Sequence, residues 1–369
     1  MRKTAEHFQE GRRIGSKDRK SKKYFTLQWH VTAKCPNACA HCYLKNESKE
    51  YKSEIRNELS FEDCIKVIDD FYSMTKSWNV GARINFTGGD PLLKEGIFDL
   101  IKYANSKGIA IGILGNGEYL NEDTVFRLKE AGVLDYQVSL DGMEETHDKL
   151  RYRGSFKETL RGIKLLNQAG IISVVMFTLS RKNMDDLIPL INLVAEENVS
   201  IFDFSRLVSI GKGVQFKKDL INPYEYRELL IKVFKEYQNL EQRGCKTIFG
   251  RKEHLWKLLY QELGLFRPLP QNREIIFRGC AIGIHLIVVG ADGTVYPCRR
   301  LPIKIGKVPN QSLRSIFINS PTLNEMRKVE KMEKCGRCEL LQYCRGCLAV
   351  AWSVSGNFFA PDPQYWKEV

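Results

Sequence analysis

The sequence predicts an α/β protein: a partial, TIM-like (β/α)6 barrel followed by a cysteine-rich C-terminal extension that contains a β-hairpin. Three observations carry this prediction. Between Tyr24 and Ser205, short apolar runs alternate with longer amphipathic stretches. The 369 residues exceed what one minimal core needs, and suit a large domain joined to a smaller one. Six of the eleven cysteines lie between Cys280 and Cys347.

Apolar runs and amphipathic stretches define the expected barrel. The expected strands are Phe25–Thr32, Arg83–Thr87, Ile109–Leu114, Leu134–Leu140, Ile171–Thr178 and Ser200–Ser205. The expected helices are Phe61–Trp78, Lys94–Ser106, Glu122–Ala131, Phe156–Ala169 and Met184–Glu197. Glycine-containing turns such as Lys107-Gly108 follow several helices, as C-terminal caps do. Such repeats with right-handed crossovers form a parallel sheet, and an incomplete barrel leaves a wide mouth that suits a bulky substrate such as a peptide.

Directly after the first expected strand, Cys35, Cys39 and Cys42 place three thiols within eight residues. Neighbouring thiolates repel one another, so this group makes sense if a multivalent metal centre neutralises them. Three ligands are one short of the four that close a tetrahedral zinc or iron–sulfur site. The loop suits three corners of a four-iron cluster whose fourth iron stays open to a small chelating molecule. A disulfide-bonded or structural-zinc loop is the alternative interpretation.

Glycines and polar residues follow the next three expected strands. They are Gly88, Gly89 and Asp90; Asn116 and Gly117; and Ser139 and Asp141, with Arg151 shortly beyond. Taken singly, each is an ordinary turn. However, the carboxyl ends of parallel strands share one edge of a sheet, where binding sites form. Glycines let the backbone approach a ligand closely, Asp90 suits an ammonium group, Ser139 and Asp141 suit a sugar, and Arg151 suits a carboxylate.

The C-terminal region holds a second field of cysteines. They are Cys280, Cys298, Cys335, Cys338, Cys344 and Cys347. The runs Leu286–Val289 and Thr294–Tyr296 flank an Asp-Gly turn, which predicts a hairpin that brings Cys280 and Cys298 together. A structural zinc knuckle is the alternative, although its two cysteine pairs are usually separated by more residues than the gap here.

Composition and charge limit the classes of partner. The formal net charge is +13, and residues 1–23 carry nine Lys or Arg against three acidic residues. This segment is expected to be a flexible basic tail with weak attraction for an acidic partner. It lacks the interleaved aromatics of a base-stacking surface, which disfavours nucleic-acid binding. Clustered cysteines without a signal peptide or a long apolar span predict a cytoplasmic, oxygen-poor setting and no membrane association.

The motif Cys35-x3-Cys39-x2-Cys42, followed by an aromatic residue, resembles the cluster-binding loop of the radical S-adenosylmethionine (SAM) superfamily. This resemblance covers about residues 24–210. It implies a 4Fe–4S cluster on the three cysteines, with SAM on the open iron. It also implies SAM contacts at His41, Tyr43, Gly88, Gly89, Asp90, Asn116, Ser139, Asp141 and Arg151. Many members carry Glu where this chain carries Asp90.

The C-terminal layout resembles the SPASM/twitch extension of that superfamily, which carries auxiliary iron–sulfur clusters. The resemblance implies that Cys280, Cys298 and Cys347 serve a nearer cluster and that Cys335, Cys338 and Cys344 serve an outer one. The spacing between Cys344 and Cys347 is shorter than in the family pattern, and the cysteine that ends the family pattern, beyond Cys347, is absent. Each cluster would then need a non-cysteine ligand, such as Asp362 for the outer one, or leave an iron open. One auxiliary cluster with spare thiols is the alternative.

The expected organisation has four parts. They are a basic tail at 1–23, the barrel at 24–212, a helical bridge at 213–275 with helices over Pro223–Gln242 and His254–Leu263, and the extension at 276–369. By resemblance, the barrel reductively cleaves SAM to a 5′-deoxyadenosyl radical. The chain is then expected to be a maturase that oxidatively modifies a peptide or protein side chain, for instance by a thioether or carbon–carbon cross-link.

Partners and alternatives follow from the same resemblance. An electron donor such as ferredoxin or flavodoxin is implied. Because only about 23 residues precede the barrel, a peptide substrate is expected to be recognised through a separate leader-binding protein or without a leader. The alternative is small-molecule chemistry of the haem-pathway type, such as tetrapyrrole side-chain decarboxylation; the stretch Phe204 to Gly213 resembles both branches. A non-enzymatic zinc-binding adaptor that uses the basic tail is a third hypothesis.

Overall fold

The computed structural model describes residues 23–45, 49–268, 276 and 278–367. Within these residues one sheet of ten strands runs in the order β10-β9-β8-β1-β2-β3-β4-β5-β6-β7. The first seven strands are β1 (Tyr24–Thr32), β2 (Gly81–Gly88), β3 (Ala110–Leu114), β4 (Val133–Ser139), β5 (Ile172–Leu179), β6 (Ile201–Arg206) and β7 (Ile248–Phe249). Neighbouring strands from β1 to β7 pair in parallel. The expected α/β fold is therefore confirmed, with the six expected strands within two residues of their predicted bounds.

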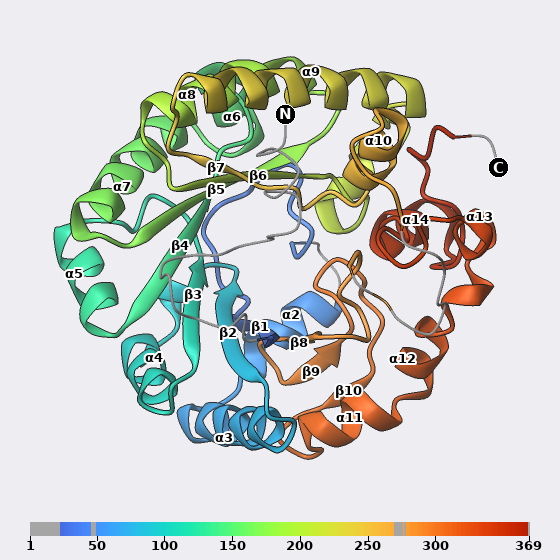
Figure 1. Cartoon of the computed structure of the whole chain (residues 1–369). Helices are drawn as coiled ribbons and strands as arrows, with labels where there is room; N and C mark the ends of the chain where they lie inside the picture. The colour runs from blue at the N-terminus through green and yellow to red at the C-terminus, as the bar shows by residue number, and fades with distance from the viewer. Residues whose placement is uncertain (1–22, 46–48, 269–275, 277, 368–369) are drawn as a thin grey trace.

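Helices follow the strands and line the outside of the curved sheet, as Figure 1 shows. Up to the extension they are α2 (Lys49–Arg56), α3 (Phe61–Ser77), α4 (Ile97–Ser106), α5 (Glu122–Glu130), α6 (Glu144–Leu150), α7 (Ser155–Ala169), α8 (Leu187–Glu196), α9 (Pro223–Gln242) and α10 (Trp256–Glu262). Short 3-10 turns are η1 (Pro91–Leu93), η2 (Met184–Asp186), η3 (Gly211–Asp219) and η4 (Val329–Lys331). The expected helices are all present, whereas α2 and α6 were not expected.

Side-chain caps set the beginnings of several helices. Ser60 accepts a hydrogen bond from the backbone N–H of Asp63 at the start of α3. At the start of α9, Asn222 and Glu225 form a reciprocal capping box, and Pro223 occupies the first helical position. These caps satisfy backbone donors that have no partner within the helix. They therefore fix where each helix leaves its preceding loop.

The core lies between the sheet and the surrounding helices. Strands of a parallel sheet are covered on both faces, so their sequences are apolar almost throughout. In β1, Leu27 and Trp29 are fully buried, and Trp29 stacks against Phe86 of β2 with 5.8 Å between ring centroids. All six residues of β6 are buried. Burial of this extent holds the strand ends in fixed positions, which is what a site built on several strands requires.

The C-terminal extension continues the same sheet. Strand β8 (Leu286–Val289) pairs in parallel with β1, with Thr26 opposite Leu286. It forms the predicted antiparallel hairpin with β9 (Thr294–Tyr296), and β10 (Gly306–Lys307) pairs with β9 at the edge. Gly293 in the turn has a φ of 83°, a conformation that glycine adopts without strain.

The extension also packs its helices beside the barrel (Figure 1). These helices are α11 (Leu313–Asn319), α12 (Pro321–Met326), α13 (Glu333–Arg337) and α14 (Leu348–Ser355). Phe317 of α11 contacts Phe25 of β1 edge to face, with ring centroids 4.9 Å apart, and also contacts Trp78 after α3. The extension and the barrel therefore share one hydrophobic core.

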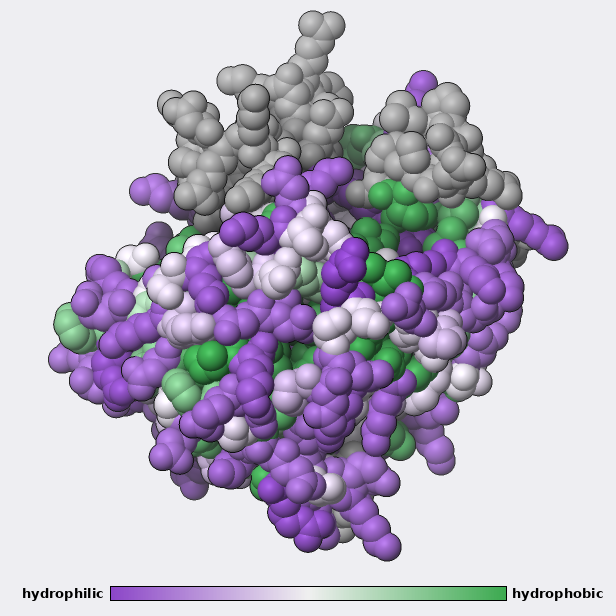
Figure 2. Space-filling view, turned by 90° about the horizontal axis from the view of Figure 1, so that it is seen from below, coloured by the Kyte–Doolittle hydropathy of each residue, from purple (hydrophilic) through white to green (hydrophobic). Residues whose placement is uncertain are grey.

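The face seen in Figure 2 is mostly hydrophilic, with apolar residues in small, separate patches. Among the described residues, none of the helices has the length and apolar character needed to cross a membrane. The predicted basic tail, residues 1–23, lies outside the described residues except for Lys23.

Candidate functional site

The loop after β1 carries the three N-terminal thiols. Cys35, Cys39 and Cys42 are unpaired and half-buried. Two distant segments hold the loop: Ala40 N–H donates to the carbonyl of Leu150 at 2.8 Å, and the carbonyl of Cys42 accepts from Lys212 N–H at 2.9 Å. The loop is therefore anchored at its centre and at its last cysteine.

The three thiols share one electrostatic neighbourhood. Burial raises the pKa of Cys35 to about 11, and the carboxylate of Asp90 and the thiol of Cys39 add to that rise. Burial also raises the pKa of Cys39, and the Cys42 thiol adds to it. A multivalent centre supplies the positive charge that such thiols need in order to ionise.

Among the residues that the structure describes, no group of three or more His, Cys, Asp or Glu side chains is arranged to hold a single metal ion. Sulfurs that bind a four-iron cluster lie further apart than sulfurs that bind one ion. The fit of a cluster therefore rests on the donor chemistry of Cys35, Cys39 and Cys42 and on their common neighbourhood.

The two glycines at the end of β2 let that strand pack against the chain that leads into the cysteine loop. A Cβ on Gly89 would lie 2.1 Å from the carbonyl oxygen of Lys34. A Cβ on Gly88, whose φ is 149°, would lie 2.1 Å from the carbonyl oxygen of Thr32. The close approach that the sequence predicted is therefore made to the protein's own backbone, and it positions Cys35.

Asp90 lies next to this contact and is fully buried. Its carboxylate accepts hydrogen bonds from the backbone N–H of Leu92 at 2.9 Å and of Asn116 at 2.7 Å. Burial raises its pKa to about 7, although these hydrogen bonds act in the opposite direction. The side-chain amide of Asn116 lies 3.8 Å from the sulfur of Cys35, and Gly117 follows it. The ends of β2 and β3 thus meet at the first cysteine.

Asp141, just beyond β4, forms a buried ion pair with Arg151. The distances are 2.7 Å from both Nε and Nη2 of Arg151 to Asp141 Oδ2. Backbone N–H of Thr178 donates to Oδ1 at 2.8 Å, and His41 Nε2 lies 3.1 Å from Oδ2. Burial acts to raise the pKa of Asp141, but Arg151 and then His41 outweigh it and hold the pKa well below its usual value.

The same ion pair reaches the cysteine loop, because Arg151 Nη1 lies 4.0 Å from the sulfur of Cys39. Ser139 is the half-buried last residue of β4. The hydroxyl of Tyr43 lies 3.5 Å from Nε2 of His30. The structure therefore brings Asn116 and Arg151 to the cysteine loop, with Asp90 and Asp141 bound to them, and it pairs Asp141 with His41. Their contacts with SAM remain predictions.

The C-terminal cysteines fall into two groups. In the first, burial raises the pKa of Cys280, and the Cys298 thiol adds to it; the Cys280 thiol adds to the raised pKa of Cys347 in the same way. Arg300 lies among them, with its backbone N–H 3.5 Å from the sulfur of Cys298 and Nη2 4.0 Å from the sulfur of Cys347. These are the three residues that the family pattern assigns to the nearer cluster.

In the second group, Cys335, Cys338 and Cys344 line one small cavity together with Arg345 and Tyr365. Burial raises the pKa of Cys335 to about 12, and Cys338 and Asp362 add to the rise. Burial and the neighbouring thiols likewise raise the pKa of Cys344. Two buried thiols and one half-buried thiol around one space fit a cluster because a multivalent centre would neutralise their charges, as at the N-terminal loop.

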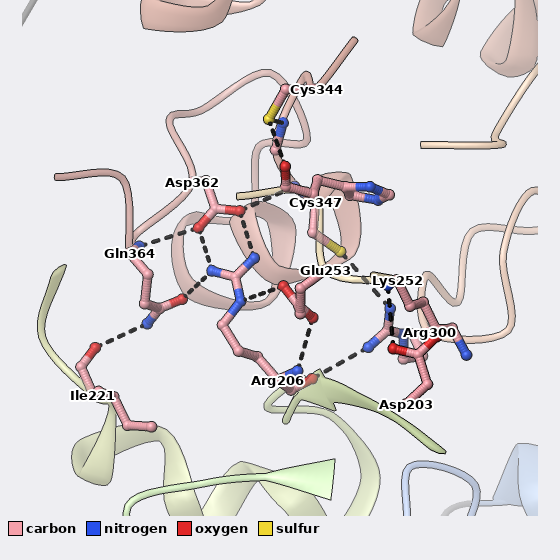
Figure 3. Close-up of polar contacts among 12 residues, drawn as sticks. Asp203, Arg206, Ile221, Lys252, Glu253, Arg300, Cys344, Cys347, Asp362 and Gln364 are labelled. Carbon is pink, nitrogen blue, oxygen red and sulfur yellow. Dashed lines mark hydrogen bonds and ion pairs between the residues drawn. The ribbon is translucent and has the colours of Figure 1, made fainter. Parts of the chain in front are cut away.

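Asp362, which the sequence suggested as a ligand for the outer group, is held elsewhere. Its Oδ1 and Oδ2 lie 2.5 and 2.9 Å from the guanidinium of Arg206 at the end of β6. Oδ2 also accepts from Cys347 N–H at 3.0 Å. Figure 3 shows Arg206 between Asp362 and Glu253, whose Oε2 lies 2.8 Å from Nε. The structure corrects this expectation, because both carboxylate oxygens are already bound.

Sequence reasoning found Arg151 but missed Arg299 and Arg300, which follow Cys298 directly. Arg299 packs over the ring of Tyr43 at 5.3 Å, and the charges of Arg299, Cys42 and Cys298 all act on the pKa of that tyrosine. Arg299 therefore lies between the N-terminal loop and the nearer C-terminal group. The one sign of Arg299 in the sequence was its position directly after Cys298. The sequence alone did not show that its side chain would lie on Tyr43.

Comparison with known proteins agrees with this geometry. The model for the radical SAM superfamily matches residues 29–194. The model for an iron–sulfur cluster-binding domain, SPASM, matches residues 280–347.

Similar proteins match along most of the chain. AdoMet-dependent heme synthase from Oleidesulfovibrio alaskensis is 29% identical over 91% of this chain and 86% of its own length. Fe-coproporphyrin III synthase from Methanosarcina barkeri is 28% identical over 94% of this chain and 88% of its own. Mycofactocin maturase MftC from Mycobacterium tuberculosis is 25% identical over 92% of this chain and 82% of its own.

Among solved structures, Streptococcus suis SuiB bound to S-adenosylmethionine superposes with a TM-score of 0.72. It shares 17% identity over 94% of this chain and 77% of that chain, a likeness of fold. The cofactors are S-adenosylmethionine and 4Fe–4S clusters. The chain carries a radical SAM domain at residues 29–194 and a C-terminal SPASM iron–sulfur domain at residues 280–347.

Proposed function

We propose that this radical SAM enzyme oxidatively modifies a side chain of an iron tetrapyrrole. The observation that carries the proposal is similarity along about nine tenths of the chain to two proteins named for haem and Fe-coproporphyrin III synthesis. The tetrapyrrole alternative is thus better supported than peptide modification. Fe-coproporphyrin III differs from haem in two side chains, which are propionates in the first and vinyl groups in the second. The reaction proposed is oxidative decarboxylation of a propionate.

When bound, the N-terminal cluster and SAM together supply the radical that removes a substrate hydrogen atom. The chain's own residues do the rest. Asp90, Asn116 and Arg151 lie beside the cysteine loop and are proposed to orient SAM. Loss of CO2 and a hydrogen atom leaves one electron to be taken up, and an iron–sulfur cluster held by Cys280, Cys298 and Cys347 would be the acceptor.

Arg299 is the proposed contact for a substrate carboxylate. It is half-buried, lies between Cys42 and Cys298, and packs on Tyr43. A guanidinium in this position is suited to bind a propionate in a bidentate manner. A neighbouring aromatic ring offers an apolar surface to the macrocycle. The net positive charge of +13 favours the approach of a polyanionic substrate.

The test is anaerobic turnover of the reconstituted enzyme with SAM, a one-electron reductant and Fe-coproporphyrin III. Mass spectrometry should show the tetrapyrrole losing the mass of CO2 plus two hydrogens for each side chain converted. Arg299→Gln should raise KM about tenfold or more, since a charge-assisted pair contributes on the order of 1.5–3 kcal/mol, while Arg299→Lys should recover part of the loss. An unchanged tetrapyrrole in the presence of SAM cleavage would contradict the proposal.

Peptide modification is the second candidate, because MftC is similar over 92% of this chain. Its test is co-expression with small open reading frames that neighbour the gene, followed by mass spectrometry of the peptides. A loss of hydrogen or of CO2 from such a peptide, with no change in the tetrapyrrole, would favour this candidate over the first.

A further inference from the structure

The outer cysteine group has a neighbour that is not a cysteine. The cavity that Cys335, Cys338 and Cys344 line is also lined by Tyr365. Leucines close its apolar side: Leu258, Leu340 and Leu341. Three cysteines and one tyrosine thus line the same small cavity. A four-iron cluster takes four protein ligands when it is closed, and the sulfurs supply three.

The Tyr365 hydroxyl is buried and makes no hydrogen bond to a nitrogen or oxygen atom of the described residues. Its neighbour is the Cys338 thiol, which adds to the effect of burial in raising the pKa of Tyr365 through its charge and a hydrogen bond. A thiol is only a weak hydrogen-bond partner, and a buried polar group without a good partner calls for an explanation, such as a missing ion. The phenol oxygen beside a sulfur of the outer group therefore points to a group that binds in the cavity.

The residues on either side of Tyr365 are fixed. Asp362 is bound to Arg206 through both oxygens (Figure 3), and it also accepts from the N–H of Gln364 at 3.1 Å. The side chain of Gln364 lies between Arg206 and the carbonyl of Ile221, at 2.6 and 3.1 Å. Trp366 donates to Glu262 at 3.0 Å. The tail therefore holds Tyr365 at the cavity, while the hydrogen bonds to Arg206 and Gln364 occupy the carboxylate oxygens of Asp362.

We propose that Tyr365, through its phenolate oxygen, is the fourth ligand of the outer iron–sulfur cluster bound by Cys335, Cys338 and Cys344. On binding, an iron–oxygen bond forms and the phenol proton is released to solvent, with no change in oxidation state. Phenolate is a hard anionic donor that ligates iron in other proteins. The guanidinium of Arg345 lies near Cys335 and Cys344, where it offsets part of the added negative charge.

The test uses the full chain with Cys35, Cys39 and Cys42 changed to alanine, so that only C-terminal clusters assemble. After anaerobic reconstitution, resonance Raman spectra should contain phenolate ring modes that are enhanced by excitation into an iron–phenolate band. Tyr365→Phe should abolish these modes and alter the electron paramagnetic resonance of the reduced cluster. The matched control is Tyr343→Phe, at a tyrosine that does not line the cavity; it should leave both signals unchanged.

Tyr365→Cys provides a second variant that keeps a ligand at this position. It should retain the iron of the outer cluster while losing the phenolate modes. The proposal is overturned if the parent chain shows no phenolate modes, or if Tyr365→Phe leaves both spectra unchanged. None of these readouts involves substrate, so failure of the tetrapyrrole assignment and failure of the tyrosine ligand are distinguishable.

Discussion

At the scale of single residues, the site depends on charges that have been removed from water. Asp141 is fully buried, and Arg151 neutralises it while also approaching Cys39. A buried charge left without its partner is much more costly than a buried pair. This pair therefore links the stability of the barrel to the position of the second cysteine.

We predict that Arg151→Met lowers the free energy of unfolding by about 3–5 kcal/mol, because Asp141 is left unpaired. The double variant Arg151→Met with Asp141→Asn should recover part of this loss. Urea unfolding of the anaerobically reconstituted protein measures both. Equal stability of the single variant and the wild type would show that the pair does not neutralise a buried charge.

His147 should make the protein sensitive to acid. Its Nδ1 accepts from the backbone N–H of Asp141 at 3.0 Å, and burial, then Arg151, lowers its pKa from 6.5 to about 4. Between these values the unfolded chain binds a proton that the folded chain does not, so stability falls as the pH falls from 6.5 to 4. The contribution is on the order of 3 kcal/mol. His147→Gln should flatten the dependence of the urea midpoint on pH in this window. An unchanged slope of midpoint against pH would contradict this role of His147.

The role of the cysteines and of the polar residues at the strand ends could be predicted from the sequence, because the local spacing of these residue types indicates their chemistry. It did not reveal their partners. Arg206 and Asp362 are 156 positions apart, and only the folded chain brings them together. For the same reason Asp362 was an open candidate in the sequence, whereas the structure shows that Arg206 occupies it.

At the scale of elements, the end of β2 positions the cysteine loop. Gly89→Ala would place a methyl group where only 2.1 Å separates it from the carbonyl oxygen of Lys34. We predict that this variant displaces the loop and loses the iron of the N-terminal cluster, while the C-terminal iron stays bound. The control is Gly108→Ala, where a Cβ meets nothing within 4 Å but the φ of 74° strains an alanine, so it measures the effect of a backbone-strained substitution that makes no clash. Iron analysis and SAM cleavage measure the difference; full iron content in Gly89→Ala would contradict the role.

The predicted strands were accurate because buried parallel strands are apolar throughout and end at clear turns. Helix α2 was missed because it has eight residues, mostly polar and none of them buried, so its apolar pattern is too short to identify a helix. Helix α6 was missed because it is short and mostly polar. The pairing of β8 with β1 could not be predicted either, since a parallel pair between the two ends of a chain leaves no local pattern.

At the scale of the whole molecule, Arg206 ties the barrel to the C-terminal tail. Its partners Glu253 and Asp362 are both buried, and Asp362 in turn holds the backbone of Cys347. This guanidinium is therefore one of the contacts that fix the barrel relative to the nearer cysteine group, beside the pairing of β8 with β1.

We predict that Arg206→Met lowers the free energy of unfolding by about 3–5 kcal/mol, because two buried carboxylates lose their counter-charge. The control is Arg181→Met, which removes an exposed pair with Glu225 and should cost about 1 kcal/mol or less. Chemical denaturation of the reconstituted variants compares them. Equal losses at the two positions would show that the network does not stabilise the fold.

The central claim is that the loop after β1 holds the cluster that cleaves SAM. The most direct measurement is anaerobic formation of methionine and 5′-deoxyadenosine by the wild type and by Cys35→Ala, with iron determined in both. We predict that the wild type forms both products, and that the variant forms neither while it keeps its C-terminal iron. SAM cleavage by Cys35→Ala, or a wild-type protein that binds only zinc, would contradict the account.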